Sequence, residues 1–337
     1  MGKIMALGEM MMRFSPPGTE TLKQHTSLET FYGGAEINVA VALSNLGTET
    51  EVITALPDNP VGDAALAYLR KEGVQTGAVQ REGNRLGTYF VEKGTAERPS
   101  KITYDRAYSS FSRWSPQETI SDSWFQDCQI LHISGITLAI SQEARETAYA
   151  LAKKAKEHGV QISFDFNYRS KLWSIEQARE AFEYFLPMVD ICFAGVKDLT
   201  NILNYNVSGD ADGEEKAYRA FMQDYGITWL ASSRRRPFTN LQHQLSGLLL
   251  HASGGRAEAP VYDVSVYDRI GGGDAFSAGI LHQILESPEA LKNMSEMITF
   301  AVAVGVLAHT VPGDAFCLPK EDVNAFLNSQ QGSDIAR

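Results

Sequence analysis

Residues 130–164 read ILHISGITLAISQEARETAYALAKKAKEHGVQISF, and this stretch is the most informative guide to the fold class. The apolar run at 130–133 predicts a buried strand, and segment 141–158 has the apolar spacing of a helix. Gly159 stands where helices commonly end in a left-handed residue, and 160–164 predicts a second buried strand. A strand, a helix and a strand in succession join two parallel strands, so the stretch predicts a parallel sheet covered by helices.

The same alternation extends outward from this unit in both directions. We expect further strands at 4–7, 52–54, 189–193, 228–231 and 245–250, and helices at 37–46, at 63–71 and from the S-x-x-Q capping box at Ser174 onward. No linker, low-complexity tract or internal repeat interrupts the pattern. We therefore expect one large α/β domain over residues 1–329, followed by a frayed polar tail at 330–337.

Two segments, at about 10–32 and 86–112, break the alternation. They contain few helical faces but several β-prone pieces, such as GTYFVE at 87–92 and KITY at 101–104. We expect these segments to form a small accessory sheet that acts as a lid over one end of the main sheet.

Composition narrows the classes of partner. The 337 residues carry 30 basic and 41 acidic side chains, a net charge of −11, which disfavours nucleic acid and anionic membranes as partners. The three cysteines, Cys128, Cys192 and Cys317, form neither a disulfide framework nor a zinc motif, and we expect buried or idle thiols. No signal peptide and no run of 18 apolar residues is present, so we expect a cytoplasmic protein.

The sharpest local motif is DRIGGGDAFSAG at 268–279. Its glycines let backbone N–H groups approach a ligand closely, and the helix that begins near Asp274 adds the positive end of its dipole. Such a loop is an anion hole, and a carboxylate at its mouth would take a proton from an attacking hydroxyl. A tight glycine turn with aspartate as helix cap is the alternative, and for an isolated motif it is the more common one.

Two further groups of residues suit a polar ligand. The motif GGAEINVA at 33–40 precedes a helix and places Asn38 in the first turn; it matches neither the dinucleotide fingerprint nor the Walker-type P-loop. Tyr89, the YDR at 104–106 and the DFNYR at 165–169 form the second group. Two converging arginines would bind a carboxylate bidentately, although for any one of these residues a surface ion pair or a satisfied tyrosine is the more common explanation.

Taken together, the early G-G-A-x-x-N-x-A, the strand-end N-Y-R and the late G-G-G-D-A-F-x-A-G resemble the ribokinase-like, phosphofructokinase-B type carbohydrate kinases. The similarity spans about residues 3–327 and is greatest to the 2-keto-3-deoxygluconate kinases, through stretches at 14–18, 56–62, 98–106, 132–136 and 165–173. The resemblance implies a three-layer α/β/α kinase domain with a mainly parallel central sheet and a small β lid.

The resemblance also implies roles for individual residues. Asp274 matches the general base that deprotonates the sugar hydroxyl, and Gly271, Gly272 and Gly273 match the anion hole for the transferred phosphoryl group. The positions that match substrate contacts are Gly33, Gly34, Asn38, Tyr89, Tyr104, Arg106, Asn167, Arg169, Asp274 and Asp314.

The chain departs from the family pattern on the nucleotide side. The usual N-x-x-E motif reads GVKD at 195–198, which leaves Asp198 as an indirect candidate for the metal. The usual K-x-G-x-x-G loop is replaced by SSRRRP at 232–237. The nucleotide candidates are therefore Ser232, Arg234, Gly271 and Gly273, with a solvated charge run as an open alternative for the arginines.

These observations predict an ATP- and Mg²⁺-dependent kinase for 2-keto-3-deoxygluconate or a close keto-deoxy sugar acid, phosphorylated at its terminal hydroxyl. Two alternatives stay open: a kinase for a neutral sugar such as fructose or ribose, and a catalytically weakened sugar-binding regulatory protein. A nicotinamide dehydrogenase is disfavoured because no dinucleotide fingerprint follows the first strand. By analogy with the family, we expect a homo-oligomer, a dimer or larger.

Overall fold

The computed structural model describes residues 2–115, 120–208, 211–287 and 289–329. Its central sheet has the strand order β13-β12-β11-β10-β9-β8-β1-β4-β5, with β14 paired to β12. The strands are β1 (Lys3–Leu7), β4 (Thr50–Leu56), β5 (Val79–Arg81), β8 (Cys128–Ser134), β9 (Gln161–Asp165), β10 (Ile191–Phe193), β11 (Trp229–Pro237), β12 (Gln242–His251), β13 (Arg256–Glu258) and β14 (Tyr262–Ser265). Neighbours from β5 to β11 are parallel, and the pairs made by β12 are antiparallel, so the sheet is mainly parallel as predicted.

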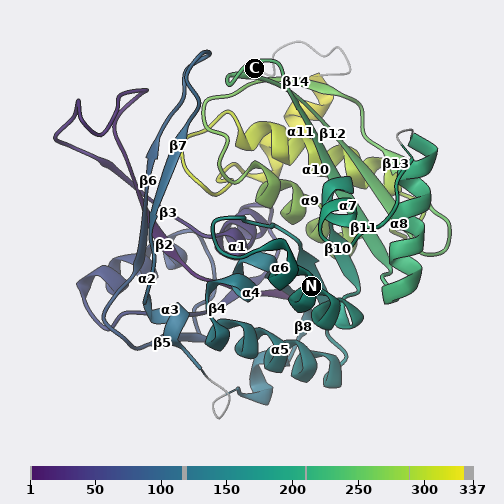
Figure 1. Cartoon of the computed structure of the whole chain (residues 1–337), viewed down its shortest axis with the longest axis horizontal. Coiled ribbons are helices and arrows are strands. Elements are labelled where there is room, and N and C mark those ends of the chain that lie inside the picture. The colour runs from purple at the N-terminus through teal and green to yellow at the C-terminus, as the bar shows by residue number, and fades with distance from the viewer. Residues whose placement is uncertain (1, 116–119, 209–210, 288, 330–337) are drawn as a thin grey trace.

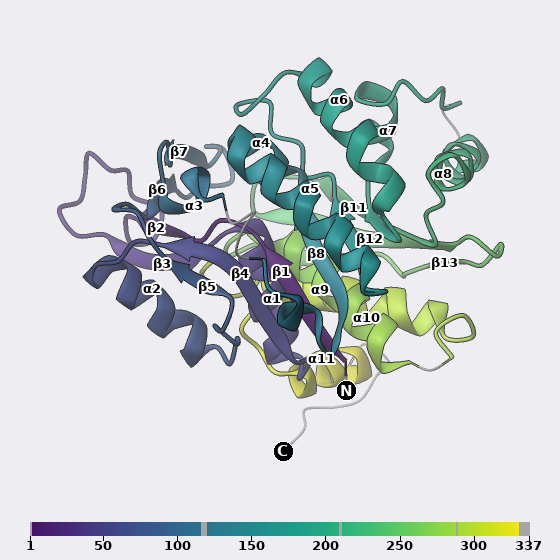
Figure 2. The same ribbon diagram turned by 90° about the horizontal axis from the view of Figure 1, so that it is seen from below.

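Helices cover both faces of this sheet (Figure 2). They are α1 (Ala35–Asn45), α2 (Pro60–Lys71), α3 (Ser110–Arg113), α4 (Gly135–Ile140), α5 (Gln142–Glu157), α6 (Ile175–Phe185), α7 (Val196–Asn201), α8 (Ala211–Tyr225), α9 (Gly272–Glu286), α10 (Met294–Ala308) and α11 (Lys320–Ser329), with 3₁₀ turns at Asp122–Phe125 and Leu186–Met188. One apolar cluster joins α5, α6 and α8 to the sheet, and another joins α1, α9, α10 and α11 to it. The three-layer α/β/α prediction is confirmed.

The strand–helix–strand unit at 130–164 forms as its sequence indicates. Strands β8 and β9 pair in parallel, with Ile130 opposite Gln161. The Ser141 side chain accepts a hydrogen bond from the Ala144 amide at the start of α5, and Gly159 follows the helix at φ 76°. An additional short helix, α4, forms between β8 and α5 because the Ser134 hydroxyl caps the amide of Ile136.

A second sheet stands at one edge of the molecule (Figure 1). Its order is β3-β2-β6-β7, from β2 (Met11–Ser15), β3 (Glu29–Gly33), β6 (Gly87–Glu92) and β7 (Lys101–Asp105). Buried and less buried side chains alternate along β2 and β6, so each has one face directed at the protein. These strands arise from the two segments that the sequence assigned to a lid, and the small β lid is confirmed.

The strand that contains the arginine run differs from its prediction. The sequence predicted a strand ending at 231, whereas β11 continues to Pro237 in register with β12, from Trp229 opposite His251 to Pro237 opposite His243. The long partner strand supplies cross-strand pairing that the local sequence does not reveal. The arginines therefore lie on a strand and project alternately to opposite faces.

Several other expectations concern the chain as a whole. That residues 1–329 form one domain stays a prediction, and the tail at 330–337 lies outside the described residues. Over the described ranges, Cys128 and Cys192 are buried free thiols, while Cys317 is free and exposed. No helix in those ranges has the length and apolar character needed to cross a bilayer.

Candidate active site

The glycine motif forms the turn into α9. Gly271 precedes the helix at φ 78°, and a Cβ added there would lie 1.6 Å from the carbonyl oxygen of Asp314, so a side chain at 271 is excluded. Gly272 packs on the ring of His309, and Gly273 faces open space. The first turn of α9 therefore presents backbone amides beside Asp274, as an anion hole requires.

The two glycine motifs meet at Asp274. The Asn38 side-chain amide donates to the Asp274 Oδ2 at 2.7 Å, and the Gly34 amide donates to the Asn38 Oδ1 at 3.3 Å. A Cβ on Gly34 would lie 2.0 Å from the Glu9 carbonyl oxygen, so this approach also requires glycine. Residues more than 230 positions apart in sequence thus converge on one carboxylate.

Burial shifts the titration of this carboxylate. The pKa of Asp274 is raised to about 7, chiefly by burial; Asn38 and Arg169 act to lower it, and the charges of Glu36 and Asp314 act to raise it. A carboxylate with a pKa near neutrality matches the requirement of a general base at physiological pH.

Further carboxylates lie at the ends of β9 and β10. Burial, with the charges of Asp274 and Asp198, raises the pKa of Asp165 to about 8, and burial also raises the pKa of Asp198. The Asp198 Oδ2 accepts the Gly195 amide at 2.7 Å, and the Asn167 amide donates to the Asp165 Oδ1 at 3.0 Å. The charge of Arg169 lowers the pKa of all three carboxyl groups, which places it near this cluster.

Within the described ranges, no group of three or more His, Cys, Asp or Glu side chains has an arrangement that could hold a metal ion. The role of Asp198 toward a metal therefore stays a prediction. Asp165 begins the DFNYR motif but was not among the predicted site residues. Its position at the carboxyl end of a parallel strand could have indicated a role in the site.

Glu36 is a second residue that sequence reasoning missed. It is buried and accepts the amide and the hydroxyl of Ser134 at 2.9 and 2.7 Å and the hydroxyl of Thr137 at 2.7 Å. Its contacts fix the start of α1 against the end of β8, which positions the early glycine motif. An acidic residue inside an apolar helical pattern was the signal for it.

The lid supplies the aromatic and arginine candidates. Tyr89 donates its hydroxyl to the Asp314 carboxylate, and Gly33 lies beside the same residue. The ring of Tyr104 stacks on that of Tyr89 at 5.7 Å and is 42% exposed. Arg106 donates to Glu9, which also accepts the Ser109 hydroxyl. These lid residues are gathered at the site, and Arg106 is already paired with a carboxylate that the sequence did not point to.

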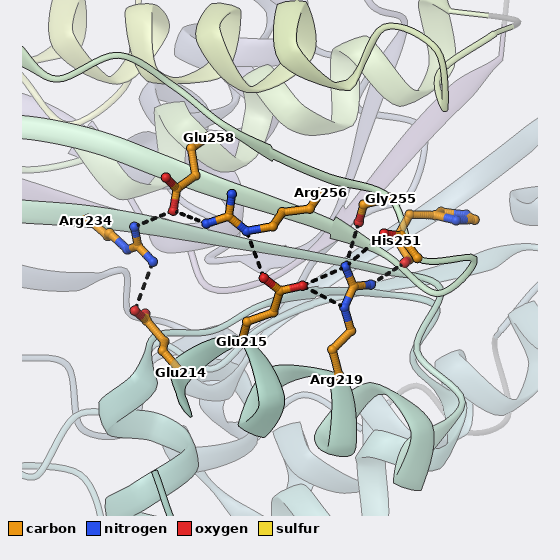
Figure 3. A network of polar contacts seen from close by, with 9 residues as sticks. Glu214, Glu215, Arg219, Arg234, His251, Gly255, Arg256 and Glu258 are labelled. Atoms are coloured by element: carbon orange, nitrogen blue, oxygen red, sulfur yellow. Dashed lines mark hydrogen bonds and ion pairs between the residues drawn. The ribbon is translucent and has the colours of Figure 1, made fainter. Parts of the chain in front are cut away.

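Among the predicted nucleotide contacts, Arg234 lies between two glutamates (Figure 3). Its guanidinium donates to Glu214 of α8 and to Glu258 of β13, both at 2.9 Å. Arg256 and Arg219 extend the network along α8 through Glu215. Ser232 is buried and within 3.0 Å of the Tyr218 hydroxyl. Both predicted nucleotide contacts of β11 thus already have partners on the α8 face.

The next arginine, Arg235, projects to the other face of β11, and His243, which is opposite Pro237 on β12, lies on that same face. Its surroundings include Arg269 of the glycine motif, whose charge, together with burial, lowers the pKa of Arg235. The rings of His243 and His309 are 6.1 Å apart, and the buried Nδ1 of His243 has no hydrogen-bond partner. Positive charge therefore gathers beside the glycine loop, from residues that the sequence analysis did not select.

Comparison with known proteins agrees with this geometry. Residues 1–234 and 246–321 match the pfkB family carbohydrate kinase model. The chain is 33% identical over 326 residues to a 2-dehydro-3-deoxygalactonokinase of Haloferax volcanii, covering 96% of both chains. It is 27% identical to the 2-dehydro-3-deoxygluconokinase of Bacillus subtilis, covering 96% of this chain and 95% of that protein.

A solved structure gives the same picture. The crystal structure of the 2-dehydro-3-deoxygluconokinase from Thermotoga maritima superposes with a TM-score of 0.92 at 33% identity, covering 97% of this chain and 98% of that one. With the family model matched over most of the chain and the ribokinase-like layers and lid in place, the chain belongs to the pfkB family of carbohydrate kinases.

Proposed function

We propose that this protein transfers the γ-phosphoryl group of ATP to the terminal hydroxyl of 2-keto-3-deoxygluconate or a closely related keto-deoxy sugar acid. The observation that carries the proposal is Asp274, held by Asn38 at the amide end of α9 with a pKa of about 7. The names of the relatives supply the substrate class, because they act on 2-dehydro-3-deoxy sugar acids of both the gluconate and galactonate series.

In the proposed reaction, Asp274 accepts the proton of the sugar hydroxyl as that oxygen forms its bond to the γ-phosphorus. The bond from phosphorus to the β–γ bridging oxygen breaks, and ADP leaves with those electrons. The amides at Gly271, Gly272 and Gly273 stabilise the charge on the transferred group. Asn38 keeps the carboxylate oriented, since its side-chain amide donates to one of the two carboxylate oxygens.

For the phosphates of ATP we propose Arg235 and Arg269, with the glycine amides. These two arginines lie on the side of β11 that faces the glycine motif, whereas Arg234 would have to leave both Glu214 and Glu258 to reach a phosphate. Guanidinium groups match phosphate oxygens in charge and geometry.

Magnesium fits the donor chemistry near Asp274. Asp165 and Asp198 are carboxylates, the ligands that magnesium prefers. Burial and the charges of Asp274 and Asp198 raise the pKa of Asp165, and a divalent cation would relieve the repulsion among these carboxylates. We propose that these two residues face the ion, directly or through water. When bound, magnesium neutralises charge on the phosphates.

The carboxylate of the sugar acid needs a cationic partner, and Arg106 and Arg169 are the candidates. Arg169 is exposed and close enough to Asp274 to influence its pKa, so it would meet a ligand without first breaking a buried contact. Arg106 is paired with Glu9, and it would exchange or share that partner when substrate binds.

The test is magnesium-dependent ADP formation with 2-keto-3-deoxygluconate, 2-keto-3-deoxygalactonate, fructose and ribose as acceptors. We expect the keto-deoxy acids to be preferred and Asp274→Asn to lower kcat by about 10²- to 10⁴-fold. Asp212→Asn, an exposed carboxylate on α8, is the matched control and should leave kcat unchanged. Preference for fructose or ribose would contradict the substrate class, and binding of the acids without turnover by the wild type would contradict the kinase itself.

A further inference from the structure

Arg13, on the lid strand β2, is the largest of the fully buried side chains in the described residues. Its guanidinium donates from Nη2 to Asp268 at 2.7 Å, from Nη1 to Asp314 at 3.2 Å and from Nε to the Ser15 hydroxyl at 2.9 Å. A charge without water must be paired, and this one is paired by two carboxylates whose side chains are at most 3% exposed. No motif in the sequence points to Arg13.

The two carboxylates lie on either side of the glycine loop. Asp268 precedes the loop, and its second oxygen accepts the Ile270 amide at 3.3 Å, which shapes the chain as it enters Gly271. The backbone carbonyl of Asp314 lies directly against Gly271. A single guanidinium therefore holds both segments that confine the anion hole.

The same guanidinium connects these segments to the lid. Ile270, inside the motif, packs on an apolar cluster of lid residues that includes Met11, Tyr89 and Val91. The Phe31 ring of β3 lies 5.0 Å from the Arg13 guanidinium carbon. The Lys93 ammonium, which follows β6, lies 3.9 Å from the Asp268 carboxylate. The lid and the glycine loop are thus joined by an apolar contact and by buried ionic contacts, of which the Arg13 contact at 2.7 Å is the shorter.

We propose that Arg13 is a positioning residue, which holds the glycine loop and the lid in the geometry that phosphoryl transfer requires by bridging Asp268 and Asp314. This proposal rests on the kinase function above. Without the guanidinium, Asp314 has no cationic partner among the described residues and Asp268 keeps only Lys93 at 3.9 Å, so the two buried carboxylates repel more strongly. The flanks of the loop then separate, and the amides of Gly271–Gly273 no longer converge on the transferred group.

The first experiment compares hydrogen exchange of amides 268–275 in wild type and Arg13→Met, a readout that does not depend on turnover. We expect faster exchange in this loop and in β2 and β6, with α8 unchanged as the internal control. Unchanged exchange in the loop would overturn the proposal, even if the protein is a kinase.

The second experiment measures kcat and KM on an acceptor that the wild type phosphorylates. We expect Arg13→Met to lower kcat by about 10²-fold, a cost typical of a small misplacement in an active site, with KM for ATP changed less than about threefold. Arg13→Lys keeps the positive charge but not the planar set of hydrogen-bond donors. Its kcat should therefore lie between those of the wild type and Arg13→Met.

Arg13→Met combined with Asp268→Asn separates positioning from folding. The double variant removes one positive and one negative charge, so we expect stability to recover while kcat stays low. Recovery of both together would overturn the positioning role and leave Arg13 a structural residue. A wild type that phosphorylates no sugar acid, with loop exchange still faster in Arg13→Met, would remove the proposed function and support the positioning.

Discussion

Arg13 and Arg234 make nearly the same contacts in opposite surroundings. Each guanidinium lies between two carboxylates from different segments, at 2.7 and 3.2 Å for Arg13 and at 2.9 Å twice for Arg234. The Arg13 side chain is 0% exposed, whereas that of Arg234 is 36% exposed. Contact distance alone therefore does not tell which pair the molecule depends on.

This difference in exposure indicates that burial decides how much stability is lost when the arginine of such an ion pair is removed. At the α8 network in Figure 3, water and salt screen the charges and can solvate a stranded glutamate. At the lid, Asp268 and Asp314 have almost no access to water, and Lys93 at 3.9 Å is the nearest other cation to Asp268 in the described part of the chain, so the loss of Arg13 leaves mutual repulsion that solvent does not screen. The exposed network fastens a helix, and the buried one controls the shape of the active site.

The largest predicted difference between Arg13 and Arg234 is in the free energy of unfolding that is lost when each is replaced. We expect Arg13→Met to lower the free energy of unfolding by about 3–5 kcal/mol, because it removes the cationic partner of buried Asp314 and leaves buried Asp268 with only Lys93 of the described cations. The matched Arg234→Met should cost less than about 1 kcal/mol. Urea denaturation followed by tryptophan fluorescence measures both, and equal losses would show that burial is not the deciding variable.

A second, smaller effect concerns the titration of Asp274 in the buried region. As general base it must be deprotonated, and its pKa is raised to about 7. We therefore expect kcat/KM for the sugar to rise tenfold per pH unit below 7 and to level above it, so that pH 5 gives about a hundredfold loss. A flat profile between pH 5 and 7 would exclude Asp274 as the titrating base.

The raised pKa of Asp274 also determines how the free energy of unfolding changes with pH. The pKa of Asp274 is higher in the folded state than the value of about 3.9 in an unfolded chain, so its contribution is fully present below that value and is lost as pH rises through about 7. Asparagine does not titrate. Asp274→Asn should therefore lose less unfolding free energy than wild type between pH 5 and pH 8, which pH-dependent denaturation checks.

Local patterns account for what could be predicted. The unit at 130–164 was readable because its signals lie within a few residues of one another, and the capping box at Ser174 forms with both of its hydrogen bonds. Asp274 and the glycines were readable because a loop that exposes amides needs small residues at fixed spacing. The hydrogen bond between Asn38 and Asp274, by contrast, is an observation of the structure that no local pattern predicted.

Most of the features that could not be predicted from the sequence depend on contacts between residues far apart in the chain. Arg13 is 255 positions from Asp268 and 301 from Asp314, and no periodicity connects them. Likewise, the pairing of Arg106 with Glu9 depends on how the lid sheet meets β1. The arginine run shows a different limit: its assignment to a loop rather than a strand hid the alternation that separates Arg234 from Arg235.

The smallest predicted effect is on KM for ATP, and it compares Arg234 and Arg235, which project to opposite faces of β11. Arg235→Gln should raise KM for ATP roughly tenfold, because one charged hydrogen-bond donor to phosphate is lost. Arg234→Gln, one residue away on the opposite face, should change KM for ATP less than about twofold, since its guanidinium serves Glu214 and Glu258. Initial rates at varied ATP and saturating sugar distinguish the two variants. The reverse order would mean that ATP draws Arg234 out of its pair of glutamates, and the exposed network would then belong to the active site.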